Sequence, residues 1–136
     1  MTEFIVNMEN QPGRLASLTE ALAAFGVNIE ALAAYGHNGE GTVRIITSDS
    51  PTTRRVLTEA DLHFEEHTVL AVQLPHQPGE LARLTRSLAD TGVNIDALYV
   101  LRANSDGIEL AISVDQPVSS LPHLDVLGGA LSDNSM

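Results

Sequence analysis

The chain contains one block of sequence twice, with the two copies 66 positions apart. Gln11-Pro12-Gly13-Arg14-Leu15 returns as Gln77-Pro78-Gly79-Glu80-Leu81, and Gly26-Val27-Asn28-Ile29 returns as Gly92-Val93-Asn94-Ile95. Between positions 10 and 32, 15 of 23 residues are identical at this offset. Two copies are too few for a solenoid, and each copy is long enough to be a small domain. The repeat therefore predicts two domains of one fold, at residues 1–66 and 67–131, and a frayed polar tail at 132–136.

Composition narrows the classes of protein and partner. The 136 residues include no cysteine, which excludes disulfides, thiolate metal sites and cysteine nucleophiles. The net charge of −11 comes without any lysine or basic patch, so we expect no nucleic-acid partner. No apolar run approaches 18 residues and no signal segment opens the chain, so we expect a cytoplasmic protein without a membrane partner.

Hydrophobic spacing in the first copy predicts alternating strands and helices. Apolar residues at 4, 6 and 8 have strand spacing, and residues 10–13 form a turn. A helical apolar stripe of Leu15, Leu18, Leu22 and Phe25 follows, and Gly26 ends that helix. Further strands are expected at about 27–35, 42–47 and 62–66, with a hairpin turn at 37–41 and a helix opened by Asp49-Ser50-Pro51.

This order of elements, β-α-β-β-α-β, predicts a ferredoxin-like α+β unit. Right-handed crossovers place both helices on one face of a four-stranded antiparallel sheet. The second copy repeats the pattern, with strands at about 68–74, 93–101 and 108–114 and a helical stripe of Leu81, Leu84 and Leu88. After Pro117 the copies diverge, and we expect a short helix at 120–131 and a poorly formed closing strand. A unit this small is marginal alone, so we expect the two units, or two chains, to share an interface, with sheets joined or abutting.

The repeated block resembles the ACT domain family, whose small regulatory modules bind amino acids. Both copies have its Pro-Gly pair before the first helix, a leucine two residues later, and Gly-Val-Asn-Ile at the second strand. The resemblance extends over the chain to about residue 117. It implies ligand contacts from the Pro-Gly loop and from the start of the second strand of a neighbouring unit. The contacts expected on this basis are Asn10, Gln11, Pro12, Gly13, Arg14, Leu15, Asn28 and Ile29, and His76, Gln77, Pro78, Gly79, Glu80, Leu81, Asn94 and Ile95. We expect the polar members of each set, Asn28 and Asn94 included, to lie at the same end of their sheet as the loop.

The physical chemistry of the loop supports this resemblance. The first backbone N–H groups of a helix lack partners and attract anions such as a carboxylate. Glycine allows a ligand to approach the backbone closely, and proline has no N–H to leave unpaired. Arg14 favours a carboxylate whereas Glu80 opposes one, so we expect the first loop to be the better site.

Each of these residues also has a purely structural interpretation. The Pro-Gly pairs can serve only to start the helices, and Asn10 can cap the turn. Asn28 and Asn94 follow a helix-ending glycine, where asparagine tolerates unusual dihedral angles. His63 and His67 lie four apart on a predicted strand, about 13 Å along it, which is too far for one metal ion.

No catalytic constellation or cofactor motif stands out, so we expect a protein that is not an enzyme. The resemblance to the ACT domain family implies a sensor of a free amino acid. It would form at least a homodimer and act on a regulated enzyme or other protein in trans. Two alternatives stay open: a ligand-free adaptor or oligomerisation module of the same fold, and a small enzyme on a ferredoxin-like frame.

Overall fold

The computed structural model describes residues 1–116 in full and the backbone of 130–132. The chain divides into two compact units, Thr2–His67 and Thr68–Met136 together with Met1. Within the described residues, no helix combines the length and the apolar composition needed to cross a membrane.

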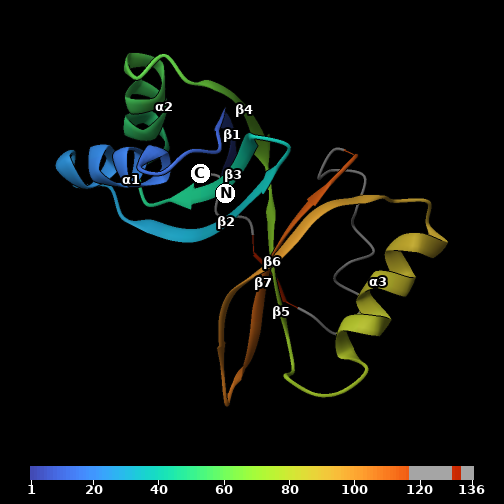
Figure 1. Ribbon diagram of the computed structural model, residues 1–136. Helices are drawn as coiled ribbons and strands as arrows, with labels where there is room; N and C mark the ends of the chain where they lie inside the picture. The colour runs from blue at the N-terminus through green and yellow to red at the C-terminus, as the bar shows by residue number, and fades with distance from the viewer. Residues whose placement is uncertain (117–129, 133–136) are drawn as a thin grey trace. The chain divides into compact units, whose positions relative to one another are not determined.

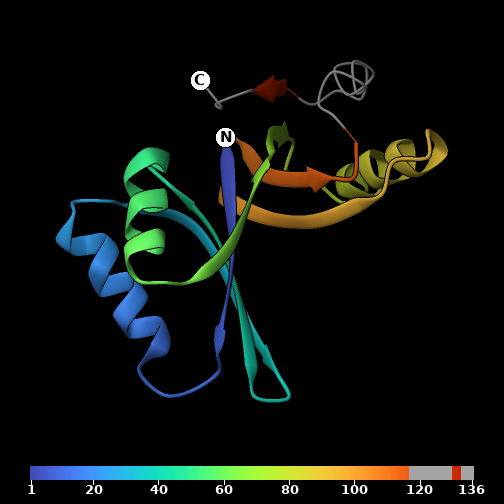
Figure 2. The same ribbon diagram turned by 90° about the horizontal axis from the view of Figure 1, so that it is seen from above.

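The first unit contains a four-stranded sheet and two helices (Figure 1). Its elements are β1 (Thr2–Glu9), α1 (Arg14–Ala24), β2 (Ile29–His37), β3 (Glu40–Thr47), α2 (Ser50–Glu59) and β4 (His63–Thr68). The strand order is β2-β3-β1-β4, and β3 is antiparallel to both of its neighbours. Helices α1 and α2 lie on the same face of the sheet (Figure 2), which confirms the predicted fold class.

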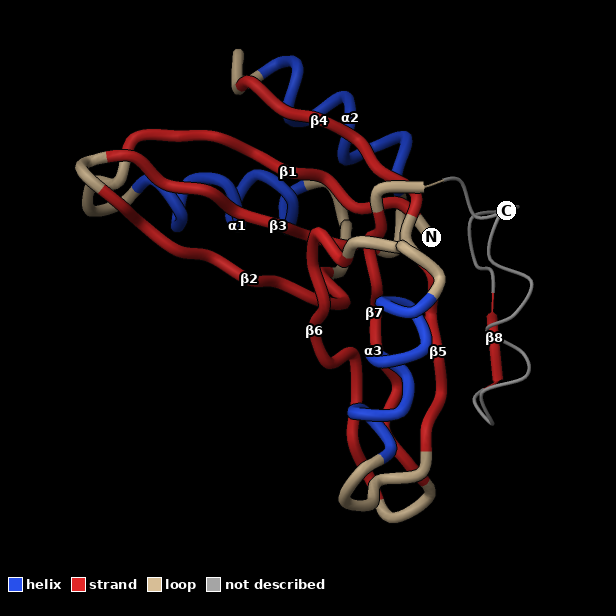
Figure 3. Tube along the Cα trace, turned by 90° about the vertical axis from the view of Figure 1, so that its right-hand side faces the viewer, coloured by secondary structure: helices blue, strands red, loops and turns tan. Residues whose placement is uncertain are grey.

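The described part of the second unit repeats the strand order of the first. Its elements are β5 (Leu70–Leu74), α3 (Glu80–Asp90), β6 (Ile95–Asn104), β7 (Gly107–Val114) and β8 (Ala130–Ser132). The order β6-β7-β5-β8 gives β8 the position that β4 occupies in the first sheet, and α3 lies over one face (Figure 3). Most of the predicted helix at 120–131 lies outside the described residues, but Ala130 and Leu131 belong to this strand. Of the predicted tail, Ser132 ends β8 and the rest lies outside the described residues.

Local turn chemistry explains where the elements end. Gly26 and Gly92 have φ angles of 72° and 77°, so each helix stops at a left-handed glycine as predicted. The β2–β3 hairpin turns through Asn38 and Gly39, which both have positive φ, as a tight two-residue hairpin requires. The Asp49 side chain accepts the backbone N–H of Thr52 and caps α2.

The core of each unit lies between its sheet and its helices. In the first unit Leu18 and Leu22 of α1 are buried against Val56 and Leu57 of α2 and against the sheet. Leu84 and Leu88 of α3 are the corresponding core residues of the second unit.

Three residues of the predicted apolar stripes are not in the core. Leu15 and Leu81 are 39% and 45% exposed, because they lie in the first turn of their helix, beside the Pro-Gly loop. Phe25 is 49% exposed, because it follows the last residue of α1. The guanidinium of Arg55 lies over its ring, 5.2 Å from the centroid, in a cation–π contact.

Candidate functional site

The two Pro-Gly loops have the same backbone conformation. Gly13 and Gly79 have φ angles of 89° and 91°, and no side chain caps the helix that follows either of them. The Arg14 N–H donates to Gln11 O at 3.2 Å, and the Glu80 N–H donates to Gln77 O at 3.3 Å. No atom lies within 4 Å of the position that a Cβ would take at either glycine. Both loops therefore present an open backbone at the positive end of a helix dipole.

The first loop borders a small hollow of about 180 Å³. The Asn10 N–H donates to Gly39 O at 3.0 Å, which ties the loop to the β2–β3 hairpin. The Asn10 side chain lies so close to the backbone of Gly36 that a Cβ at position 36 would overlap it. Tyr35 of β2, 57% exposed, lines the same hollow. Of the predicted contacts, the hollow brings together Asn10, Gln11, Arg14 and Leu15.

Charge at the first loop comes from an exposed ion pair. Arg14 Nη2 lies 3.1 Å from Glu9 Oε2, and the two side chains are 55% and 63% exposed. Exposed pairs of this kind are weak because water screens both charges. The guanidinium therefore remains accessible to a second carboxylate.

Between residues 10–15 and 76–81 the two loops differ at two positions, where His76 replaces Asn10 and Glu80 replaces Arg14. Beside the loop, Pro75 replaces Glu9 and Arg102 replaces Gly36. Glu80 lies 3.5 Å from Arg83, and Arg102 lies 3.6 Å from Glu109. The second loop thus keeps the backbone of the first but has a carboxylate where the first has a guanidinium.

Asn28 and Ile29 lie at the opposite end of the sheet from the loop of their own unit. Ile29 pairs with Thr47 near the start of β1, whereas Asn10 follows the end of β1. Seven residues of strand separate these ends, roughly 23 Å. The prediction that Asn28 and the loop lie at one end of the sheet is therefore wrong, because the α1 crossover returns the chain to where β1 began. The pairing of Ile95 with Val114 places Asn94 in the same way in the second unit.

The asparagines at these positions are held by backbone hydrogen bonds and not by unusual dihedral angles. Neither asparagine has a positive φ, so the interpretation that these positions need asparagine for an unusual dihedral angle is wrong. The Asn28 N–H donates to Ser48 Oγ at 3.0 Å, and the Asn94 N–H donates to Asp115 Oδ1 at 3.0 Å. The Asn94 side chain also donates to Asp96 at 3.2 Å.

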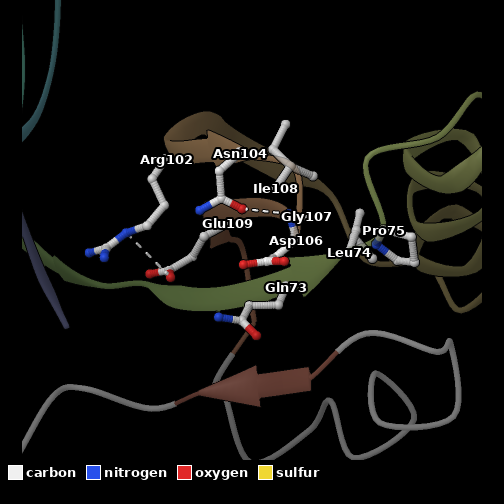
Figure 4. A pocket seen from close by; sticks show the side chains of 9 residues that line it. All are labelled: Gln73, Leu74, Pro75, Arg102, Asn104, Asp106, Gly107, Ile108 and Glu109. Carbon is white, nitrogen blue, oxygen red and sulfur yellow. Dashed lines mark hydrogen bonds and ion pairs between the residues drawn. The ribbon is translucent and has the colours of Figure 1, made fainter.

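A larger hollow, of about 520 Å³, lies in the second unit and contains none of the predicted contacts (Figure 4). Gln73 and the Arg102–Glu109 pair line it, beside the turn in which the Asp106 N–H donates to Asn104 Oδ1 at 2.8 Å. The hollow is open and mainly polar, and the Arg102 guanidinium that lines it already pairs with the Glu109 carboxylate. Sequence analysis missed it because its residues come from three strands without a common motif.

The strongest charge pairs lie away from both loops. The fully buried Glu3 accepts from Arg44 at 2.9 Å; burial alone would lower the pKa of Arg44, but the Glu3 carboxylate raises it. The hydrogen bond from Arg54 lowers the pKa of Glu66. Neither pair lies in a hollow, so we assign both to the stability of the sheet. Among the described residues no three metal-ligating side chains gather.

Comparison with known proteins agrees with the fold described above. A family model described as an ACT domain pair matches residues 1–119. The chain is similar to the crystal structure of protein BT0572 from Bacteroides thetaiotaomicron, with 26% identity, a TM-score of 0.87, and coverage of 97% of this chain and 91% of that one. It shares the fold of the ligand-free regulatory subunit of aspartate kinase from Thermus thermophilus, with 14% identity, a TM-score of 0.61, and coverage of 93% and 86%. No curated protein matches the chain.

Proposed function

The chain belongs to the ACT domain pair family, and from this premise we propose that it binds a free amino acid at its first Pro-Gly loop and thereby regulates a partner protein. The observation that carries the proposal is the uncapped start of α1 at the left-handed Gly13, beside a hollow that Arg14 and Asn10 line. The family whose model matches is a regulatory module, so the proposed role is non-catalytic.

The chemistry of this loop suits an α-carboxylate. The first N–H groups of α1 and the Arg14 guanidinium offer donors on one side of the hollow. A helix end contributes up to about 2 kcal/mol in a partly buried geometry, which is too little for a tight site. The ammonium and side chain of the ligand must therefore find further partners, which a second unit can supply.

The edges of the first sheet indicate where a second copy would dock. β4, at one edge, carries His63, Glu65 and Glu66, and such charges discourage edge-to-edge pairing. β2 lies at the other edge, and its nine residues include only one acidic side chain. Its apolar side chains Leu32 and Tyr35 are exposed. A long apolar edge of this kind favours pairing with another strand.

Antiparallel pairing of two β2 strands would complete the proposed site. It would bring the start of one β2, with Asn28 and Ile29, to the end of the other, where Gly36 lies against Asn10. Residues 23 Å apart in one unit would thereby meet across the interface. A ligand held by both copies binds only the docked state, and this difference in affinity is what a sensor requires.

A thermal-shift screen of the twenty amino acids identifies the ligand. At 100 times its dissociation constant, a ligand adds about 2.7 kcal/mol to the free energy of unfolding, which is readily detected. If none of the twenty raises the melting temperature, the ligand-free adaptor becomes the better interpretation.

The loop is then tested by calorimetry with a matched pair of glycine variants. Gly13→Ala and Gly26→Ala both add a methyl group at a positive φ with open space around it, so both cause similar backbone strain. We expect only Gly13→Ala to weaken binding, because only Gly13 borders the proposed carboxylate site. Unchanged binding by folded Gly13→Ala would place the ligand elsewhere.

A further inference from the structure

A second hollow of about 420 Å³ lies in the first unit between α1, α2 and the sheet, and we call it the interhelix hollow. It lies on the side of α1 that faces α2, whereas the loop hollow lies on the side that faces β2. The two share only the side chains of Met8, Glu9 and Arg14. Its volume falls within the range typical of small-molecule sites.

The floor of the interhelix hollow is apolar. Leu18 and Val56, 4% and 3% exposed, belong to the core, and Met8 and Leu62 pack against that core from the two strands. Small side chains, Ser17, Ala21 and Ala60, line the helical walls and leave the space between α1 and α2 unfilled. Such a floor suits an aliphatic chain of three or four carbons.

The rim carries charges of both signs. Glu9 and Arg14 lie at the end of β1 and the start of α1, whereas Asp61 lies in the connection from α2 to β4 and His63 begins β4. Asp61 directly follows the C-cap of α2, and its left-handed φ of 56° is the conformation that commonly ends a helix, which aspartate tolerates. Within the described part of the chain, the Asp61 carboxylate makes no hydrogen bond or ion pair, so it is free to accept one.

We propose that the interhelix hollow is a second ligand site, on the other side of α1 from the loop hollow and sharing Arg14 with it, for an α-amino acid with an aliphatic side chain. The side chain lies on the floor, the carboxylate faces Arg14, and the ammonium faces Asp61. The charges favour a zwitterion over the corresponding 2-oxo acid, because the rim offers carboxylates as well as the guanidinium. The inference does not depend on the function proposed for the Pro-Gly loop.

Calorimetry with a series of amino acids tests the floor. Alanine, 2-aminobutyrate and norvaline differ by one methylene at each step, and each added methylene should tighten binding about fourfold. Leucine should bind at least as tightly as norvaline, and its 2-oxo acid about tenfold more weakly or worse. Affinities that do not rise with chain length, or no binding of norvaline and leucine, would overturn the proposal.

Variants locate the ligand. Ala21→Leu fills the hollow and should abolish the binding whose affinity rises with chain length, whereas Ala23→Leu makes the same change on the exposed face of α1 and should leave that binding intact. Asp61→Asn preserves the left-handed turn, which asparagine tolerates. It should lower the affinity for the amino acid about tenfold and leave the affinity for the 2-oxo acid unchanged. This variant decides the question if Ala21→Leu fails to fold.

The loop variant separates the two proposals. Binding lost in Gly13→Ala but retained in Ala21→Leu and Asp61→Asn would overturn the interhelix site and leave the loop site standing. Binding lost in Ala21→Leu and Asp61→Asn but retained in Gly13→Ala would support the interhelix site and count against the loop.

Discussion

At the scale of single residues, leucines three positions apart in the same helix differ in how deeply they are buried. Leu15 and Leu18 of α1 are three positions apart, yet the first is 39% exposed and the second 4%. The same contrast separates Leu81 from Leu84 in α3. Helical spacing identifies the face that packs on the sheet, but it does not show that the first turn lies beside an open loop.

Leucine-to-alanine changes in these helices test that contrast. Leu18→Ala and Leu84→Ala should each lower the free energy of unfolding by about 2–5 kcal/mol, because each leaves a cavity in a buried core. Leu15→Ala and Leu81→Ala should change it by about 0.5 kcal/mol or less. Urea unfolding of all four variants measures this, and equal losses within a pair would contradict the observed burial.

The contact between Asn10 and Gly36 makes a second prediction at this scale. Gly36→Ala should displace the Asn10 side chain, whereas in an Asn10→Ala background the added methyl group has room and should stabilise the strand. Unfolding free energies of the four proteins in this double-mutant cycle measure the coupling. Strictly additive values would mean that the two residues do not pack together.

At the scale of elements, α2 begins with the capping residue that the sequence predicted, Asp49. Asp49 accepts the Thr52 hydroxyl at 2.6 Å and the Thr52 N–H at 3.1 Å, and these two bonds lower its pKa. The fully buried Thr53 donates its hydroxyl to Asp49 O at 2.8 Å, and its oxygen accepts from the Thr47 hydroxyl at 2.7 Å. The cap thus links the helix to the end of β3.

The lowered pKa of Asp49 predicts a pH-dependent contribution to stability. A carboxyl whose pKa is lower in the folded state than in the unfolded state stabilises the fold above its unfolded value, about 3.9, and stops doing so as the pH falls through the folded value. Asp49→Ala should therefore melt at a lower temperature than the wild type near neutral pH, and the gap should narrow below about pH 4. A difference in melting temperature that stays constant from pH 7 to pH 3 would show that the charge of the Asp49 carboxylate does not contribute to the cap.

At the scale of the whole molecule, sequence analysis predicted the duplication, the fold class and the order of strands and helices. It succeeded there because hydrophobic period, turn glycines and caps are local signals, and they agree in both copies. It misplaced Asn28 relative to the loop because proximity along the sheet depends on the direction of the crossover. It did not find the interhelix hollow, which small side chains from distant segments create.

Association of whole chains should depend on which edge of the first sheet is altered. Leu32→Lys puts a charge on the apolar β2 edge and should shift a dimer toward monomer, because desolvating an unpaired lysine at a strand interface is unfavourable. Glu65→Lys on β4 is the matched control and should leave the mass of the assembly in solution unchanged. Sedimentation velocity decides the matter: a dimer that survives Leu32→Lys does not use this edge.

Fusion of the two units into one chain has a consequence for symmetry. When a single module forms a two-fold dimer, every substitution occurs on both sides, so both sites change together. Here the loop has become Asn10 and Arg14 in one unit and His76 and Glu80 in the other, on an unchanged backbone. In a covalent pair the two loops can differ, so a substitution that removes a possible ligand contact from one loop leaves the other loop unchanged.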